Sequence, residues 1–261
     1  MGGVSPLYLR VVSNAGRVTA KTRRSGQVEY RPAEGLPVAW AGAGELGSVP
    51  FETCAPIRKP ASYKGQKNFT GQWWSATTGT HLAFDSWVKR DFLISADFDP
   101  AVVAISVWPF TFQFRSRSGK LRDHTPDVFL RFAGGNASLV DVRTTTSASE
   151  RDNEAFAAAA ALCEGAGWSY LRAAEQPVVR AANLRWLAGY RHGRNRDHVV
   201  AATIDSRLAE GPLCIDSLAA AVGEPIAVLP TIYHLLWTHE VVADVDTAPL
   251  SGHTLIETGQ T

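Results

Sequence analysis

The sequence predicts a mixed α/β protein, a sheet flanked by helices and followed by a smaller C-terminal module. Three observations indicate this class: a helical stripe of apolar residues, then four short β-rich segments, then an alanine-rich helix that leads into one more strand. An antiparallel run of strands followed by a helical crossover fits this order. With 261 residues, the chain has room for one large domain or two smaller ones.

The first 80 residues give the weakest signals. Residues 1–50 predict a β-rich extension, with a hairpin formed by residues 9–12 and 18–21 and a further strand at 27–30. Residues 51–80 mix lysines with aromatic side chains. That mixture suits contacts with nucleic acid phosphates and bases, and it equally suits an aromatic loop packed on its own domain.

The middle of the chain gives clearer signals. A helix is expected to begin at Phe84, because Phe84, Trp87, Val88 and Phe92 share one side, and to end at Asp97–Pro100. Pro177 suits the start of a later helix, whose apolar stripe includes Trp186 and Tyr190. The other expected elements are strands at 102–108, 110–115, 128–132, 139–143 and 168–173, and an alanine-rich helix at 150–164.

The chain changes character after the basic linker Arg191–Asp197. Two short helices at 215–222 and 230–239 and a hairpin within 241–255 suggest a winged helix-turn-helix module, and a small helical appendage is the alternative. We therefore expect an N-terminal β-rich extension at 1–50, a central domain at 51–195 and a winged-helix-like module at 196–261.

Composition bounds the possible partners. The formal net charge of +1 neither demands nor excludes nucleic acid, because a balanced sum can hide a basic face. The three cysteines are far apart and form no CxxC pair, so a zinc ribbon or a disulfide framework is not expected. Reduced thiols and the absence of a membrane-length apolar run favour a cytoplasmic protein without membrane contact.

Two aspartates and an arginine form the candidate site. Asp127 lies where a turn enters a strand, and Asp141 lies in the next strand, two residues before Arg143. Paired strands bring such residues to one edge of a sheet, and Asp141 and Arg143 point to the same face. A carboxylate among apolar residues needs a partner or a metal. The pattern indicates a Mg²⁺ and phosphate site, and a structural Asp141–Arg143 pair with Asp127 in a turn is the alternative.

At this point the chain resembles TnsA-like subunits of heteromeric transposases, which are endonucleases of the PD-(D/E)xK, restriction-endonuclease-like superfamily. The resemblance spans residues 50–195 and is most specific from Ser86 to Pro100 and at Pro126-Asp127. It implies a restriction-endonuclease-like sheet, hydrolysis of one DNA strand at transposon ends with Mg²⁺ or Mn²⁺, and two partners, double-stranded DNA and a second transposase subunit.

The resemblance also implies residue roles. Asp127 and Asp141 take the two acidic metal-binding positions of the motif, and Arg143 stands where the family has lysine. Arginine can steady a phosphate but is a poor proton acceptor. Lys89 replaces the helix glutamate of the family and cannot ligate Mg²⁺, so Asp85, which lies four residues earlier on the same flank, is expected to be the third metal ligand and catalytic residue.

Several assignments stay open. Asp91 is the alternative to Asp85, His124 is either a general base or a solvated loop residue, and Thr144–Thr146 either line the site or end a polar strand. The expected function is a metal-dependent endonuclease subunit. One alternative is a catalytically degenerate DNA-binding or assembly subunit, because Lys89 and Arg143 both depart from the motif. Another is a winged-helix regulator with an unrelated α/β ligand domain.

Overall fold

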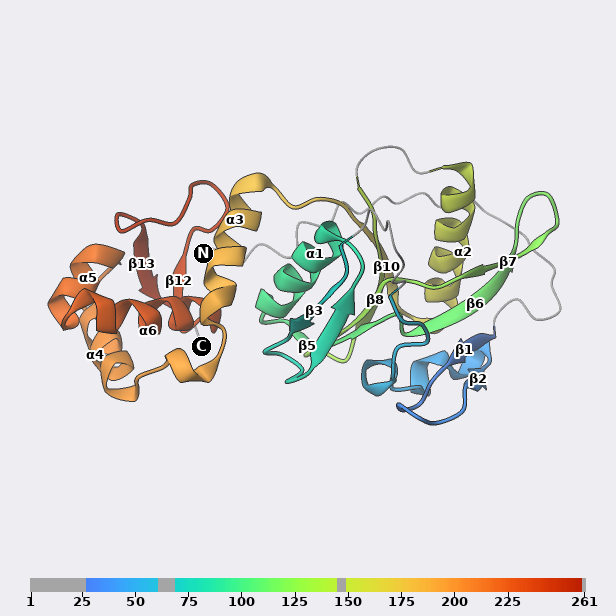
Figure 1. The fold of residues 1–261 in the computed structure, drawn as a ribbon, viewed down its shortest axis with the longest axis horizontal. Coiled ribbons are helices and arrows are strands. Elements are labelled where there is room, and N and C mark those ends of the chain that lie inside the picture. The colour runs from blue at the N-terminus through green and yellow to red at the C-terminus, as the bar shows by residue number, and fades with distance from the viewer. Residues whose placement is uncertain (1–26, 61–68, 145–148, 260–261) are drawn as a thin grey trace. The chain divides into compact units, whose positions relative to one another are not determined.

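The computed structural model describes residues 27–60, 69–144 and 149–259, and the described chain is mixed α/β, as predicted (Figure 1). The hairpin expected at 9–12 and 18–21 lies outside the described residues. The chain divides into two compact units, Met1–Glu175 and Gln176–Thr261, and each is described by itself. Among the described residues, no helix has the length and apolar character needed to cross a membrane.

The first unit contains a four-stranded sheet with the order β10-β9-β8-β5. The strands β5, β8 and β9 are antiparallel neighbours, and β10 pairs with β9 in parallel after the chain has crossed through α2. The predicted antiparallel run and helical crossover are therefore confirmed for these four strands, whereas the strand expected at 110–115 belongs to another sheet. The elements are β5 (Val102–Val107), β8 (Val128–Phe132), β9 (Ala137–Val142), α2 (Glu150–Ala166) and β10 (Ser169–Ala173).

A second sheet, with the order β2-β1-β6-β7, belongs to the same unit. The described end of the expected N-terminal extension pairs with β6, so it is part of this unit and not a separate piece. No strand was expected at β7, because most of its residues are polar and exposed and only His124 is buried. The strands are β1 (Val28–Tyr30), β2 (Ala39–Ala41), β6 (Phe110–Arg115) and β7 (Leu121–His124).

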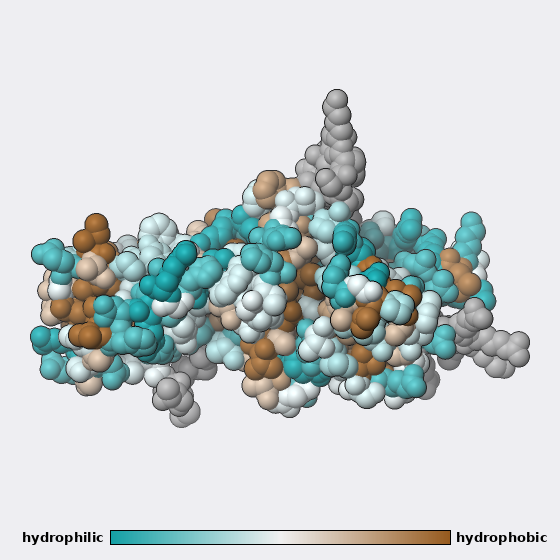
Figure 2. All heavy atoms as spheres, turned by 60° about the horizontal axis from the view of Figure 1, so that its bottom comes forward, coloured by the Kyte–Doolittle hydropathy of each residue, from teal (hydrophilic) through white to brown (hydrophobic). Residues whose placement is uncertain are grey.

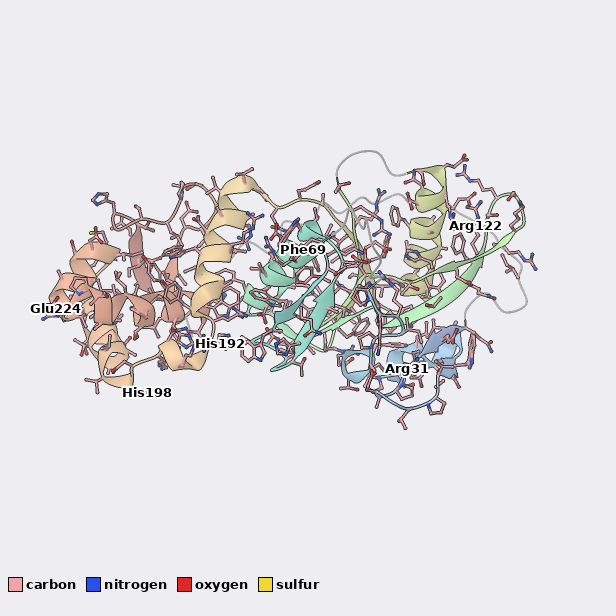
Figure 3. All side chains as sticks on the ribbon, in the orientation of Figure 1. Arg31, Phe69, Arg122, His192, His198 and Glu224 are labelled. Atoms are coloured by element: carbon pink, nitrogen blue, oxygen red, sulfur yellow. The ribbon has the colours of Figure 1, made fainter. Side chains whose placement is uncertain are left out.

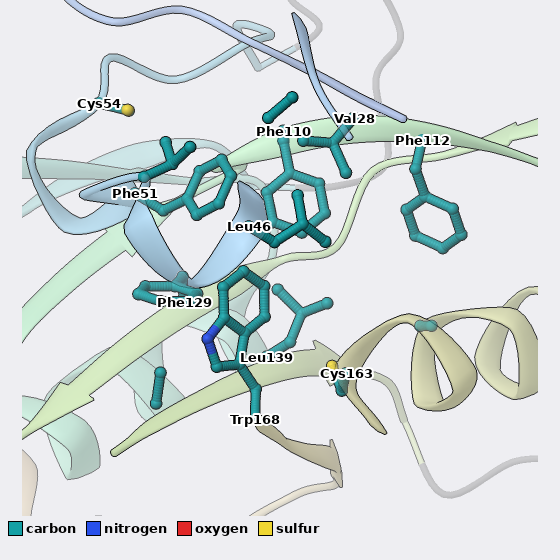
Figure 4. Close-up of a cluster of buried hydrophobic side chains, with 14 of the residues drawn as sticks. Val28, Leu46, Phe51, Cys54, Phe110, Phe112, Phe129, Leu139, Cys163 and Trp168 are labelled. Atoms are coloured by element: carbon teal, nitrogen blue, oxygen red, sulfur yellow. The ribbon is translucent and has the colours of Figure 1, made fainter. Parts of the chain in front are cut away.

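Aromatic side chains fill the core between these elements (Figure 4). Phe51, which lies in the short helix η2 (Phe51–Thr53), packs against Phe110, Phe129 and Trp168 with ring centroids 4.8, 5.8 and 5.6 Å away. Each buried aromatic side chain stabilises the fold by roughly 1.5–3 kcal/mol relative to its exposed state. A second short helix, η1 (Ala43–Ser48), contributes the buried Leu46.

The helix α1 (Trp87–Phe98) begins three residues later than expected, because Phe84 belongs to the hairpin of β3 (Gly71–Trp74) and β4 (His81–Phe84). Ser86 caps the helix by accepting a hydrogen bond from the Lys89 amide. At the other end, buried Asp97 accepts hydrogen bonds from the hairpin, donated by Trp73 Nε1, Ser75 Oγ and the amides of Ala76 and Thr77. This carboxylate ties the hairpin to the last turn of α1.

The second unit combines helices with a three-stranded sheet of order β11-β13-β12. The helix α4 was not expected, and α6 begins five residues before the expected start because Pro230 lies inside the helix. The elements are α3 (Val178–Leu187), η3 (Ala188–Tyr190), η4 (Gly193–Asn195), α4 (His198–Leu208), β11 (Leu213–Cys214), α5 (Ile215–Val222), α6 (Pro225–Trp237), β12 (Val241–Ala243) and β13 (Leu255–Thr258).

The structure divides the chain at Glu175 and Gln176, whereas the sequence placed the boundary at residues 195 and 196. The helix α3 accounts for the difference. Its buried Asn183 donates two hydrogen bonds to backbone carbonyls, those of Val245 and Ala248, and accepts one from the Leu250 amide. These bonds fasten α3 to the loop after β12, so α3 belongs to the second unit.

Candidate functional site

Strand pairing places Asp127 and Asp141 together, as expected. The antiparallel register of β8 and β9 sets Val128 opposite Val140. Asp127, which immediately precedes β8, therefore lies beside the strand that carries Asp141. The Asp127 amide donates to the Val140 carbonyl at 3.0 Å, and the Val142 amide donates to Asp127 Oδ2 at 2.9 Å. Both aspartates are buried, with exposed fractions of 3% and 0%.

The backbone carbonyl of Asp127 is also held. It accepts a hydrogen bond from the amide of Trp108, which joins β5 to β6 and has a φ of +47°. A large side chain rarely adopts this left-handed conformation, so the surrounding contacts must stabilise it. One of them is the Arg58 guanidinium, which lies 4.0 Å from the centroid of the Trp108 ring. The position of Asp127 is therefore fixed from both its backbone and its side chain.

Lys89 links the helix to the strands. Its Nζ lies 2.7 Å from Asp85 Oδ1 and 2.8 Å from Asp127 Oδ1. The other oxygen of Asp85 accepts a hydrogen bond from Arg58 at 2.9 Å. The ammonium group thus bridges Asp85 and Asp127, two of the three carboxylates that were expected to bind a metal.

Arg143 holds the remaining oxygen of Asp127. Its Nη1 donates to Asp127 Oδ2 at 2.7 Å, and its Nη2 lies 4.0 Å from Asp141 Oδ1. Burial opposes its charge, but the charges of Asp127 and Asp141 outweigh burial and raise the pKa of Arg143. The side chain is 39% exposed, so part of the guanidinium remains open to solvent.

Asp141 has its own pair of partners. The Tyr170 hydroxyl donates to Asp141 Oδ2 at 2.8 Å, and His124 Nε2 lies 2.9 Å from the same oxygen. A carboxylate accepts, so this contact requires the His124 proton on Nε2. Asp141 Oδ1 is buried and forms no hydrogen bond. His124 is therefore a buried residue of β7, and its interpretation as a solvated loop histidine was wrong.

Charge in this cluster is balanced within the protein. Three carboxylates, Asp85, Asp127 and Asp141, meet three cations, Arg58, Lys89 and Arg143. Burial opposes ionisation of Asp85, but hydrogen bonds and charge from Lys89 and Arg58 outweigh it and lower its pKa. Burial and the nearby Asp141 charge raise the pKa of Tyr170, so its hydroxyl remains a donor.

The three carboxylates do not fit a divalent metal in this arrangement. Mg²⁺ requires free carboxylate oxygens at about 2.0–2.1 Å in octahedral geometry. Both oxygens of Asp85 and both oxygens of Asp127 instead accept from cations. Among the described residues, no group of three or more histidines, cysteines or acids is placed to hold a metal ion. Asp91, the alternative third acid, pairs with Arg90 at 2.7 Å.

Sequence reasoning found the acids and Arg143 but missed their partners. The signal for Tyr170 and His124 was the apolar setting of Asp141, which demands hydrogen-bond donors from neighbouring strands. The bridging position of Lys89, in the first turn of α1, depends on how this helix packs against the sheet. Thr144 lies two residues beyond the end of β9, and Thr145 and Thr146 lie outside the described residues.

His124 also lines a hollow of about 280 Å³ on the first unit, between β7 and the start of α2. Arg122 and Arg151 bring positive charge to it, and Asp123 and Asp152 bring an equal negative charge. Arg122 already pairs with Glu154 at 3.0 Å. The hollow therefore has no net charge that selects an anion or a cation.

The three cysteines are free thiols, as expected. Burial raises the pKa of the Cys54 thiol to about 11 and that of the Cys163 thiol to about 12, so both stay protonated and unreactive. Neither thiol lies in the ion-pair cluster. No protein-family model matches the chain, and no curated protein sequence matches it significantly.

Proposed function

We propose that this chain is the nuclease-like subunit of a heteromeric transposase and that it holds the DNA backbone at the Asp127–Asp141 edge. The carrying observation is the convergence of Lys89, Asp127, Asp141 and Arg143, the residues at the positions that the resemblance implies for the site, together with Asp85. The sheet order, with an antiparallel meander and a parallel crossover strand, is compatible with a restriction-endonuclease-like fold.

The charge pattern supports a binding and assembly role without metal. A buried carboxylate that is already paired with Lys89 and Arg143 has no need of Mg²⁺ to be stable. The exposed part of the Arg143 guanidinium offers planar donors to a phosphate oxygen. Double-stranded DNA is the ligand that this proposal assigns, and a second transposase subunit is the proposed protein partner.

A DNA-binding measurement tests the proposal. Arg143→Ala should weaken binding to a short duplex about fivefold and lower the salt dependence by about one phosphate contact, because backbone contacts release counterions. The matched control is Arg207→Ala, which removes an exposed arginine of α4. Equal effects of the two changes, or no duplex binding by the unmodified chain, would contradict the proposal.

Metal-dependent strand cleavage is a second candidate function. One observation favours it: Asp141 Oδ1 is buried without a hydrogen bond, close to Asp127 and Arg143. A nicking assay on supercoiled DNA with Mg²⁺ or Mn²⁺ and the second subunit present decides the matter. Nicks that Asp127→Asn abolishes, while duplex binding persists, would support cleavage. Duplex binding without nicks would leave the binding role alone.

The Lys89→Glu variant distinguishes the binding role from the cleavage role by whether a metal ion stabilises the protein. This change restores the carboxylate of the family at the helix position and removes the ammonium that bridges Asp85 and Asp127. We expect Mn²⁺ to raise the thermal midpoint of the Lys89→Glu protein and to leave that of the unmodified chain unchanged. A Mn²⁺-dependent rise in the unmodified chain would favour cleavage.

A further inference from the structure

The last part of the chain has a charge opposite to that of the rest. Residues 198–261 contain one arginine, no lysine and eight acidic residues, a formal net charge of −7. Residues 1–197 contain 25 basic and 17 acidic residues, a net charge of +8. A DNA-reading module needs a basic face, because phosphate contacts supply most of its affinity. Residues 198–261 have a net negative charge instead.

The helix α6 stands where a helix-turn-helix places its DNA-reading helix, since it follows α5 after a short turn and precedes two paired strands. From Ile215 to Trp237 the sequence contains no lysine or arginine, and its two acids are Asp216 and Glu224. Glu224, at the start of α6, is exposed (Figure 3). The first turn of α6 therefore presents a carboxylate and apolar side chains where phosphate-binding residues would be required.

An apolar stripe runs along the outer side of α6. Ile226, Pro230 and Tyr233 follow at spacings of four and three residues and so share one face. Ile226 is 86% exposed, and Pro230 and Tyr233 are partly exposed. Tyr233 continues the stripe by packing on Trp186 and Tyr190, with ring centroids 5.8 and 4.9 Å away. We call these five residues the α6 stripe.

Acidic residues accompany the α6 stripe. Glu224 precedes Ile226 by two residues, and Asp216 is an exposed residue in the first turn of the neighbouring helix α5. Figure 2 shows brown, hydrophobic side chains gathered at the end of the picture where Figure 1 places α4, α5 and α6. An exposed apolar surface with an acidic border is a typical protein docking site, since the surface of a DNA reader is basic.

We propose that the α6 stripe docks a protein partner that presents apolar side chains bordered by lysine or arginine, and that this part of the chain does not contact DNA. Apolar contact with Ile226 and Tyr233 would supply affinity, and Glu224 and Asp216 would select a basic partner. The inference is independent of the proposed function, because it concerns residues outside the Asp127–Asp141 edge.

The full-length chain and a labelled amphipathic helical peptide of lysine and leucine provide the test, read by fluorescence anisotropy. Ile226→Ser should weaken peptide binding about tenfold and Glu224→Lys about fivefold. Two matched controls should leave it unchanged. Val178→Ser removes an apolar side chain of α3 that is 85% exposed, and Glu34→Lys reverses an exposed acid of the first unit.

Four results would overturn the proposal. One is the lack of saturable peptide binding, and another is an equal loss in the Val178→Ser control. The third is weaker binding of a short duplex DNA by Ile226→Ser, which would make α6 a DNA reader. A concentration-dependent dimer in sedimentation that Ile226→Ser dissolves would assign the surface to a second copy, and this too would overturn it. Failure of duplex binding alone would affect only the proposed function.

Discussion

Two regions of this chain, the surroundings of Asp127 and Asp141 and the last 64 residues, use charge in opposite ways. Around Asp127 and Asp141, charges are buried, paired and close to neutral in sum. In residues 198–261, most of the acidic residues are exposed, and the core is apolar. Buried charge has to be compensated locally, so it fixes geometry. Exposed charge costs little and instead determines which molecules can approach.

The largest expected effect on stability comes from the removal of a buried carboxylate. Asp127→Ala leaves Lys89 and Arg143 without their shared partner, and the loss of one member of a buried ion pair costs about 3–5 kcal/mol. We expect the free energy of unfolding in urea to fall by about that amount. Asp205→Asn, in the exposed surface of α4, should change it by less than about 0.5 kcal/mol. Similar values for both would show that the buried ion pairs of Asp127 stabilise the fold no more than an exposed carboxylate does.

A smaller effect is expected at the second carboxylate. His124→Leu removes one of the two partners of Asp141 Oδ2 and leaves Tyr170 in place. The loss of one hydrogen bond to a buried carboxylate costs about 1.5–3 kcal/mol, which urea unfolding would measure. Tyr170→Phe should cost a similar amount, and the double variant should cost more than the sum, because Asp141 then loses both donors. A strictly additive double variant would show that the two bonds do not cooperate.

The stability of the protein at acid pH depends on the ion pairs of Asp85. The pKa of Asp85 is lower in the folded protein than the ordinary value of about 3.9. Its ionised form is therefore favoured by folding, and its contribution is present above the unfolded pKa and is lost as the pH falls towards the folded pKa. Unfolding free energies measured from pH 5 downwards should fall less steeply in Asp85→Asn. Identical pH profiles would show that Lys89 and Arg58 do not stabilise the ionised form.

The smallest expected effect is at the α6 stripe. Ile226→Ser changes a side chain that is mostly exposed to water in the free chain. The free energy of unfolding should therefore change by less than about 0.5 kcal/mol, and the thermal midpoint should hardly move. Calorimetry of the Ile226→Ser and Val178→Ser proteins provides the measurement. A large destabilisation by Ile226→Ser alone would show that this side chain is buried in the free chain and is therefore not available to a partner.

Periodicity predicted the elements that bury one clear face. The strands β6 and β8 and the helix α5 have the predicted bounds, since each is bounded by turn residues. The helix α4 was missed, because three small or aliphatic residues, Ala201, Ile204 and Leu208, are the only fully buried ones among its eleven. The start of α6 was misplaced at Pro230. The hydrogen bond that proline cannot donate would go to the carbonyl of Ile226 in the exposed first turn, where water can replace it.

The candidate site was predictable in its residues but not in its contacts. Strand alternation and the turn before β8 predicted that Asp127, Asp141 and Arg143 lie close together, and the structure places them so. The resemblance identified Lys89 only as a departure from the family. Its bridging role depends on where the first turn of α1 lies over the sheet, which is a tertiary property that no local pattern encodes.

The Asp97 carboxylate determines which parts of the first unit unfold together in local opening. Because it accepts hydrogen bonds from Trp73, Ser75, Ala76 and Thr77, the hairpin of β3 and β4 cannot detach without leaving a buried charge without its partners. Hairpin and helix should therefore open as one cooperative segment, with similar hydrogen-exchange protection for the amides of Ala76 and Thr77 and for those of α1. The same helix carries Lys89. Opening of the hairpin and separation of the Lys89 ammonium from Asp85 and Asp127 should therefore occur at the same rate.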